Sequence, residues 1–255
     1  WQWRWIGYSI NTLLPVAQVG GDVWRTHLAV RYGMAPSRAA ASVIADVTLG
    51  TLGQVLFSLA GALLFIQQVG GGRLAYSLLA GILVFLVALG LFLHLQRSGR
   101  LGILIKRIAR RFGRQDDRDG QLAATSIELE LKRIHSERKP VWLALFWRLC
   151  ALLLSVGEVW LLLWALGSPV SLLEALLLES LTLGLRRAAF LVPGGYGVQE
   201  GGFILLGGAL GLPADLALSV SLAKRLRELL VGLPAVALVG MLGGRRHANS
   251  RMRSA

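Results

Sequence analysis

The sequence predicts an all-α, polytopic integral membrane protein, and three observations support this fold class. Hydrophobic residues make up 55% of the 255 residues and charged residues only 16%, whereas a soluble domain carries about 25% charged residues. The apolar residues form runs long enough for the roughly 20 helical residues that cross a bilayer. The net charge is +13, but the bases lie between and beside these runs, which indicates cytoplasmic loops rather than a nucleic-acid-binding surface.

Four long apolar segments are expected to be helices, at about 39–68, 74–96, 141–166 and 213–242. They divide the chain into a first membrane unit at 1–96, a basic loop at 97–140, a second membrane unit at 141–242 and a basic tail at 243–255. The sequence begins with Trp1 and shows no cleavable signal pattern, so we expect native sequence upstream of the first unit. The one cysteine, Cys150, excludes an intrachain disulfide.

Charge sets the expected topology of these segments. The loop at 97–140 holds 12 bases and 6 acids, a net +6, and the tail holds further arginines, so both are expected in the cytoplasm. The loop is predicted to be either a solvated linker or to begin with an interfacial amphipathic helix near 101–108. Because the segment at 141–166 then leaves the cytoplasm and the last segment returns to it, residues 168–212 must leave and re-enter on the outer side.

That outer region contains two apolar pieces, 172–192 and 198–212, joined by Pro193-Gly194-Gly195-Tyr196-Gly197. The second piece is too short to span a bilayer comfortably, which predicts a re-entrant pair that dips in from the outside. A similar break follows residues 5–14, where Pro15 and then Gly20-Gly21 interrupt the apolar pattern. The same count of crossings predicts that this first pair dips in from the cytoplasm.

The two breaks resemble an inverted repeat. Pro15 and Pro36 are 21 residues apart, and Pro193 and Pro213 are 20 residues apart. Paired segments interrupted by Gly and Pro are typical of transporter binding sites, since broken backbone at membrane depth persists only where it lines a protein or water-filled cavity. Coincidence is the alternative, because Gly and Pro are common in membrane helices. The residues expected to shape the cavity are Pro15, Gly20, Gly21, Pro193, Gly194, Gly195 and Gly197.

Several charges fall at membrane depth, where each costs about 2.5–3.5 kcal/mol on insertion scales. We hypothesise that four bases line a site for an anionic lipid headgroup and that three acids are their counter-charges. The bases are Arg186, Arg187, Lys224 and Arg225, and the acids are Asp46, Glu200 and Glu228. Two alternatives stay open: an internal ion-pair network without a ligand, and a role for Arg186-Arg187 as markers of the membrane interface.

Three motifs carry a resemblance to a known family. They are Asn11-Thr12-Leu13-Leu14-Pro15 with Gly20-Gly21-Asp22 and Arg25, the block from Phe190 to Gly202, and Arg225-x-x-Glu228. The chain resembles the lysylphosphatidylglycerol synthase transmembrane (flippase) family over nearly its whole length, and within it the hopanoid-biosynthesis-associated membrane proteins. The Pro-Gly-Gly-x-Gly-x-Gln-Glu-Gly block is the most specific part. These motifs add Arg25, Tyr196 and Gln199 to the candidate substrate-binding residues.

The resemblance implies a bacterial inner-membrane fold with re-entrant helices and a lipid-translocating role. In bifunctional members a soluble aminoacyltransferase domain follows the membrane part. This chain ends in a short basic tail, so we expect it to lack that enzymatic half. The expected partners are membrane lipids, either anionic phospholipid or hopanoid, and the C-terminus is expected in the cytoplasm.

Enzymatic alternatives find little support in the sequence. His27, His94, His135 and His247 are scattered without metal-ligand spacing. The glycines of the second break miss the dinucleotide-binding pattern and follow an apolar piece rather than a strand. We therefore expect no metal and no cofactor. Two alternatives to a flippase remain: a membrane glycosyltransferase or lipid-modifying enzyme, with Asp22, Glu174, Glu179 or Glu200 as its acids, and a scaffold that docks lipid-synthesis enzymes on the basic loop.

Overall fold

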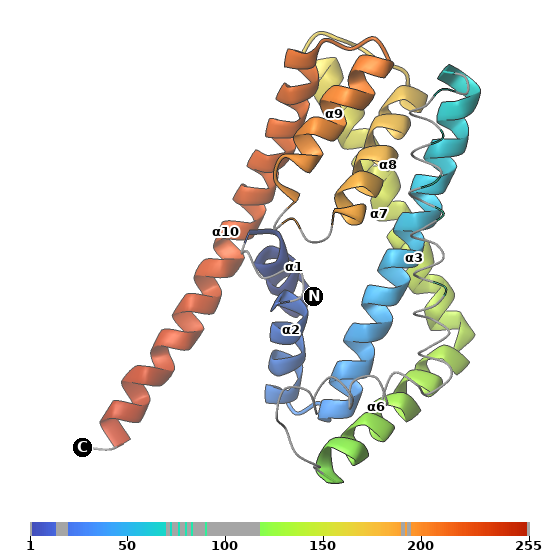
Figure 1. The fold of residues 1–255 in the computed structure, drawn as a ribbon. Helices are drawn as coiled ribbons and strands as arrows, with labels where there is room; N and C mark the ends of the chain where they lie inside the picture. Colours follow the sequence, from blue (N-terminus) through green and yellow to red (C-terminus); the bar gives the residue numbers. More distant parts are fainter. Residues whose placement is uncertain are drawn as a thin grey trace. The chain divides into compact units, whose positions relative to one another are not determined.

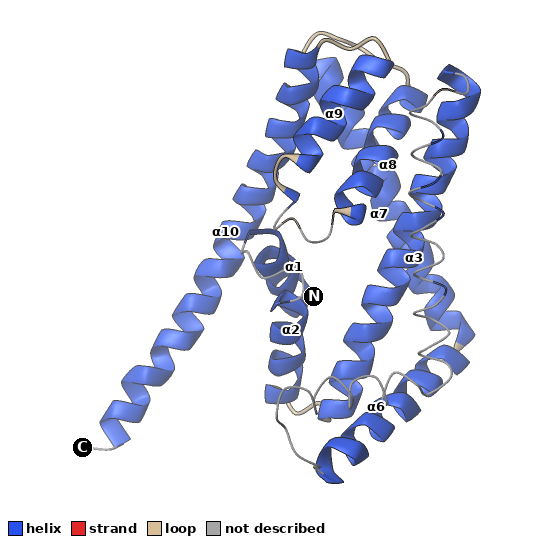
Figure 2. Ribbon diagram, viewed as in Figure 1, coloured by secondary structure: helices blue, strands red, loops and turns tan. Residues whose placement is uncertain are grey.

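A computed structural model of the chain confirms the all-α class: the residues that it describes form helices and no strand (Figure 2). It describes residues 2–13, 20–69, 118–189 and 195–253, together with the isolated residues 72, 76, 80, 83, 90 and 192. Most of the predicted segment at 74–96 and the start of the predicted basic loop lie outside the described residues. Pro15, Pro193 and Gly194, three of the expected cavity-shaping residues, also lie outside them.

The helices are arranged in two compact units, each of which is described by itself (Figure 1). Unit 1 comprises Trp1–Tyr32 and Ala189–Ala255, and unit 2 comprises Gly33–Ala188. The helices of unit 1 are α1 (Gln2–Leu13), α2 (Gly20–Arg31), α9 (Val198–Ala209) and α10 (Ala214–Arg253). The helices of unit 2 are α3 (Pro36–Val69), α6 (Arg118–Ser136), α7 (Arg138–Ala165) and α8 (Leu172–Ala188).

Two helices of unit 2 are long and apolar enough to cross a membrane. They cover Pro36–Gln68 and Arg138–Ala165, with mean hydropathies of 1.9 and 1.7, and they confirm the helices expected at 39–68 and 141–166. Pro36 opens α3, where its fixed φ suits the first helical position. Gly167 stops α7 with a φ of +79°, which favours glycine. Trp142 and Trp164, near the two ends of α7, are exposed, as expected of an interfacial aromatic belt.

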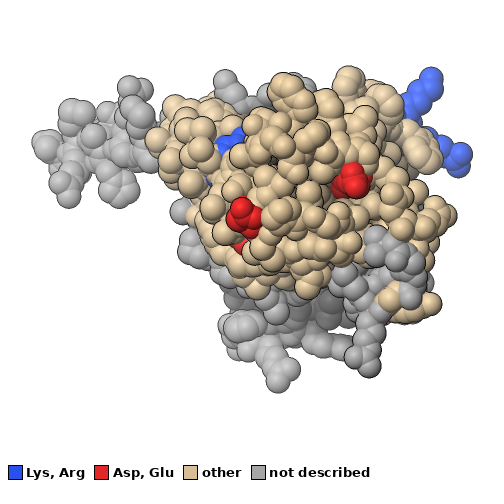
Figure 3. Space-filling model, turned by 90° about the horizontal axis from the view of Figure 1, so that it is seen from above, with Lys and Arg blue, Asp and Glu red and all other residues tan. Residues whose placement is uncertain are grey.

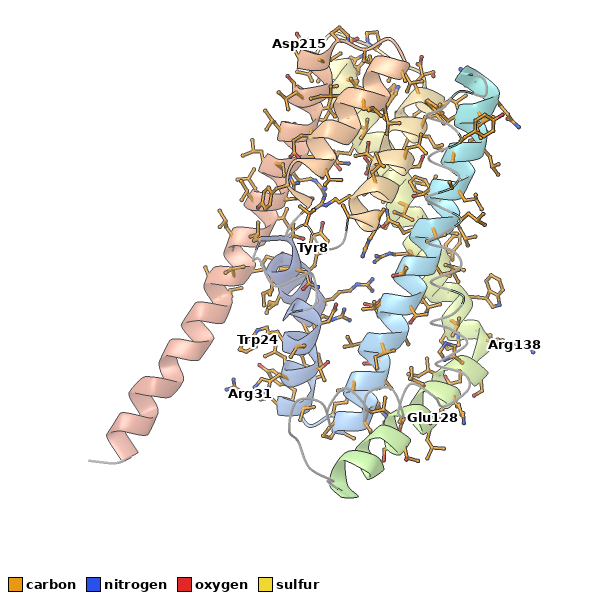
Figure 4. All side chains as sticks on the ribbon, viewed as in Figure 1. Tyr8, Trp24, Arg31, Glu128, Arg138 and Asp215 are labelled. Atoms are coloured by element: carbon orange, nitrogen blue, oxygen red, sulfur yellow. The ribbon has the colours of Figure 1, made fainter. Side chains whose placement is uncertain are left out.

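The described part of the predicted basic loop is helical, whereas its start, with the predicted choice between an amphipathic helix and a solvated linker, lies outside the described residues. α6 occupies Arg118–Ser136, and a single residue separates it from α7; Figure 4 labels Glu128 on α6 and Arg138 at the start of α7. α6 packs against α3, and an Arg38–Glu130 ion pair with an N–O distance of 3.6 Å joins the two helices. Half-buried Ile127, Leu131 and Ile134 share one face of α6. This apolar face explains why so charged a segment folds against α3.

The rest of unit 2 is a packed bundle in which α8 contacts both α3 and α7. Small residues bring α3 and α8 close together, as is typical of helix pairs in membranes. The hydroxyl of Ser58 donates a hydrogen bond to the carbonyl of Ser180 at 2.8 Å. A Cβ at Gly61 would collide with the side chain of Ser180. The α3–α8 interface therefore depends on the absence of a side chain at Gly61.

In unit 1, α1 packs against α2 and α10, and α9 packs against α10. The apolar core joins Ile6 and Ile10 of α1 with Leu28 of α2 and Ala235 of α10. The predicted first broken pair is thus a pair of contacting helices. α10 covers all but the first residue of the segment predicted at 213–242 and continues to Arg253, with Pro234 inside it. α8 and α9, the two arms of the second predicted pair, belong to different units, and the re-entrant inverted repeat stays a prediction.

Exposed apolar side chains cover much of the described surface. Most described atoms on the face drawn in Figure 3 are neither acidic nor basic. On α7, Trp147 is 63% exposed and Leu154 is 77% exposed. On α10, Leu226 and Leu230 are 58% and 66% exposed. A soluble protein rarely exposes so many large apolar side chains. On a membrane helix such side chains face the lipid tails and not water.

Candidate functional site

The guanidinium of Arg225, on α10, is the centre of a buried polar cluster in unit 1. Its side chain is only 11% exposed. Nε contacts Glu200 Oε1 at 3.0 Å, and Nη1 contacts Glu228 Oε2 at 3.0 Å. Nη2 donates a hydrogen bond to the carbonyl of Gly195 at 3.0 Å. All three guanidinium nitrogens therefore bind protein groups, in three directions that a lysine ammonium does not reproduce.

Arg225 connects the second break to α10 through Glu200, which also caps the start of α9. Gly197 precedes the helix with a φ of +78°, and its N–H donates to Glu200 Oε2 at 2.7 Å. Glu200 thus uses one oxygen to cap the start of α9 and the other to hold Arg225. The ring of Tyr196 lies under the guanidinium, with its centroid 4.5 Å from Cζ, which is a favourable cation–π distance.

The neighbouring turn of the α9–α10 interface is also polar. Lys224 is only 4% exposed, and its Nζ lies 5.8 Å from the centroid of the Phe203 ring. Gln199 is 2% exposed and donates from Nε2 to the hydroxyl of Ser221 at 3.3 Å. The charges of Lys224, Arg225, Glu200 and Glu228 sum to zero. A balanced cluster of this kind offsets the cost of burying each charge.

A second polar cluster fixes the start of α2. The side-chain oxygen of Asn11, on α1, accepts a hydrogen bond from the N–H of Gly21 at 2.7 Å. The amide nitrogen of Asn11 donates to Asp22 at 3.3 Å, and Asp22 in turn pairs with Arg25 at 3.3 Å. A Cβ at Gly21 would collide with the carbonyl of Gly7. Gly21 is therefore required for the close approach of the α1 and α2 backbones.

Unit 2 holds a third polar group, along one row of α3. Arg187 of α8 donates from Nε to Gln54 Oε1 at 3.4 Å. Arg148 of α7 lies against the same helix: a Cβ at Gly50 would be 2.9 Å from its Nη2, and a Cβ at Gly53 would be 3.3 Å from its Cγ. The two glycines leave the space that the long arginine side chain occupies.

Comparison with known proteins identifies the family. Residues 2–235 match the family described as the lysylphosphatidylglycerol synthase TM region. The chain belongs to this family. A UPF0104 membrane protein from Methanothermobacter thermautotrophicus is 24% identical over 234 residues, which cover 87% of this chain and 68% of the relative. No solved structure is significantly similar to the chain.

Membership of the lysylphosphatidylglycerol synthase TM region family, together with the apolar helices α3 and α7, establishes a membrane protein. It confirms the family inferred from the three motifs. The narrower assignment to hopanoid-associated proteins stays a prediction.

In this family member the expected substrate-binding residues fall into separate groups. Tyr196, Glu200, Arg225 and Glu228 meet around the guanidinium, with Gly195 and Gly197 beside them. Lys224 and Gln199 line the next turn of the same interface. Arg25, Gly20 and Gly21 lie at the start of α2, and Asp46, Arg186 and Arg187 belong to unit 2. The four bases predicted to line one site are thus divided between the units, and their joint role stays a prediction.

The acids considered for an enzymatic role make structural contacts. Glu174 forms a capping box with Ser171 at the start of α8, through hydrogen bonds of 2.7 and 3.2 Å. Asp22 and Glu200 pair with arginines, and Glu179 is 1% exposed. In the described part of the chain, no group of three or more His, Cys, Asp or Glu side chains is arranged to hold a metal ion.

Arg148 and Gln54 were not among the residues predicted from the sequence. Arg148 is the one base in the apolar run at 141–166, which also holds Glu158, so its signal was a single base ten residues into a helix that is otherwise mostly apolar. Gln54 is uncharged and carried no signal beyond its place in an apolar segment.

Proposed function

We propose that this family member moves a polar-headed lipid between the two leaflets of a bacterial inner membrane and is not an enzyme. The observation that carries the proposal is the contact between Arg225 and the carbonyl of Gly195. A break at membrane depth leaves backbone groups without helical partners, and here a buried side chain supplies one. Membrane transporters typically build their binding sites from such discontinuous helices.

The proposed mechanism is alternating exposure of a polar cavity shaped by the two breaks. The lipid headgroup occupies the cavity while the acyl chains remain in the bilayer. The substrate is an anionic phospholipid or a hopanoid-type lipid, and the C-terminus lies in the cytoplasm with the basic segment at 97–140. Arg225 acts mainly as a positioning residue, since its three nitrogens already hold the break and two carboxylates.

Lipid translocation in proteoliposomes tests the proposal. Headgroup-labelled phospholipids are placed in both leaflets, and a membrane-impermeant quencher is added outside. We expect the protein to remove the protected inner-leaflet fraction, and we expect Glu200→Gln and Arg225→Lys to slow this loss strongly. Arg227→Ala is the matched control, because Arg227 lies on the same helix but its side chain is exposed.

Folding of each variant is checked by its elution as a single species in detergent. A protected fraction that persists for phosphatidylglycerol, phosphatidylethanolamine and a hopanoid alike, with folded protein, would refute translocation. The two alternative functions, a scaffold and a lipid-modifying enzyme, would then be the hypotheses to test.

A further inference from the structure

The side chain of Gln54 in unit 2 carries a buried hydrogen-bond donor without a described acceptor. Gln54, in the middle of α3, is 5% exposed. Its oxygen accepts from Arg187, but its amide nitrogen Nε2 has no hydrogen-bond partner among the described residues. The orientation of the amide is secure, because a flipped amide would turn its N–H groups toward the donor of Arg187. Gln54 therefore presents two buried N–H groups that lack an acceptor in the part of the chain that the structure describes.

Such a group is costly inside a membrane-spanning helix. An unsatisfied buried donor costs about 1–3 kcal/mol, and no bulk water is present at that depth to relieve it. Unmet buried polar groups are rare in native proteins and often mark functional positions. An acceptor that binds there would recover the lost hydrogen bond.

Two arginine side chains, from α7 and α8, lie against the same face of α3 as Gln54. Nη2 of Arg148 lies 2.9 Å from the position of a Cβ at Gly50, and Nε of Arg187 donates to Gln54 Oε1 at 3.4 Å. Positions four apart on a helix are surface neighbours, about 5–6 Å apart at Cβ. The amide donor and both guanidinium groups thus lie along about one turn of α3. Asp46 lies one further turn along this row, so the three charges sum to +1.

We propose that Gln54 of α3, Arg148 of α7 and Arg187 of α8 form a buried binding site for a phosphate group within unit 2. This inference rests on the proposed translocation of lipid and names the chemistry that its substrate carries. Arginine guanidinium groups bind phosphate oxygens through paired, charge-assisted hydrogen bonds. The Gln54 amide adds a neutral donor, which completes the coordination without a further buried charge. Gly50 and Gly53 keep the row open for Arg148.

Binding to the full chain in detergent micelles tests the site directly. The probe is fluorescent phosphatidylglycerol. Two compounds are compared with it: a diacylglycerol with the same acyl chains, which lacks the phosphate, and sn-glycerol 3-phosphate, which lacks the acyl chains. We expect phosphatidylglycerol to bind and diacylglycerol to bind much more weakly. Competition by sn-glycerol 3-phosphate would show that the phosphate alone is recognised, and binding of the lipid without such competition would show that the acyl chains are also needed.

Two substitutions separate binding from folding. Gln54→Leu removes the donor and is expected to weaken binding about ten- to a hundredfold. Gln54→Glu gives Arg187 a stronger partner, which favours folding, but places a negative charge where the phosphate would lie, so binding should fall at least as far. Thr182→Val is the matched control: Thr182, on α8, is 2% exposed and its hydroxyl also has no described partner, but it lies about 140° around the helix from Arg187.

The outcomes distinguish this site from the proposed function. Unchanged phosphatidylglycerol binding in folded Gln54→Glu, or equal binding of diacylglycerol, would overturn the site. Weakened binding in Gln54→Glu but not in Thr182→Val would support it. Phosphate-dependent binding without translocation in proteoliposomes would keep the site and refute the translocation of lipid. Undiminished translocation by Gln54→Glu would refute the site alone.

Discussion

At the scale of single residues, the contacts of Arg225 link α10 to α9 and to the break before it. Arg225→Ala leaves two carboxylates and a carbonyl without their donor. Removal of one partner from a buried ion pair destabilises by about 3–5 kcal/mol, and we expect a loss of this order. Denaturant-induced unfolding in detergent measures it. The exposed Arg227→Ala should change the unfolding free energy little, and equal losses in the two variants would contradict the prediction.

Gly50 offers a second test at this scale. Gly50→Ala should displace the guanidinium of Arg148, since the added Cβ would lie 2.9 Å from Nη2 and 3.2 Å from Cζ. The displaced atoms end a flexible side chain, so the protein should still fold, with a stability loss of about 1 kcal/mol. In an Arg148→Ala background the same change should be neutral or stabilising. Thermal unfolding of the four proteins of this cycle shows whether the two effects depend on each other, and additive effects would contradict the contact.

At the scale of helices, apolar length was a reliable guide and charge was not. α3 and α7 were predictable because long apolar runs leave few alternatives to a membrane helix. α6 was not predictable, because its many charged residues obscure the apolar pattern and its apolar face is buried only by packing against α3. The end of α8 at Ala188, four residues before the predicted end, also depends on surroundings, since neighbouring residues decide where a helix stops before a glycine-rich break.

The pairing of α1 with α2 leads to a prediction about Gly21. A Cβ there would meet the carbonyl of Gly7, and backbone on both sides leaves nothing flexible to move. Gly21→Ala should therefore separate the two helices and cost about 1–3 kcal/mol. Gly201→Ala on α9, where an added Cβ has no neighbour within 4 Å among described atoms, is the control. The midpoint of thermal unfolding should fall for Gly21→Ala only, and an equal fall in both would show that the close approach is unimportant.

At the scale of the whole molecule, the motifs indicated which residues matter but not how they are grouped. Arg225 and Glu228 are three residues apart on one helix, so their pairing follows from helix geometry. The contact of Arg225 with Gly195, 30 residues away, requires the α9–α10 packing. The sequence places Arg187 near Gly195 in the chain, yet the fold assigns them to different units. Their separation of eight residues in the sequence therefore did not predict that they belong to different units.

Membrane topology provides the test of the whole arrangement. If residues 168–212 leave and re-enter on the outer side, Pro169 after α7 and Ala214 at the start of α10 face the same compartment, opposite to Ser136 at the end of α6. In a Cys150→Ser background, which removes the one native cysteine, Pro169→Cys and Ala214→Cys should react with a membrane-impermeant maleimide from outside, and Ser136→Cys only after permeabilisation. Labelling of Ala214→Cys together with Ser136→Cys would mean that α8, the break and α9 cross the membrane once, and the inverted repeat would then be wrong.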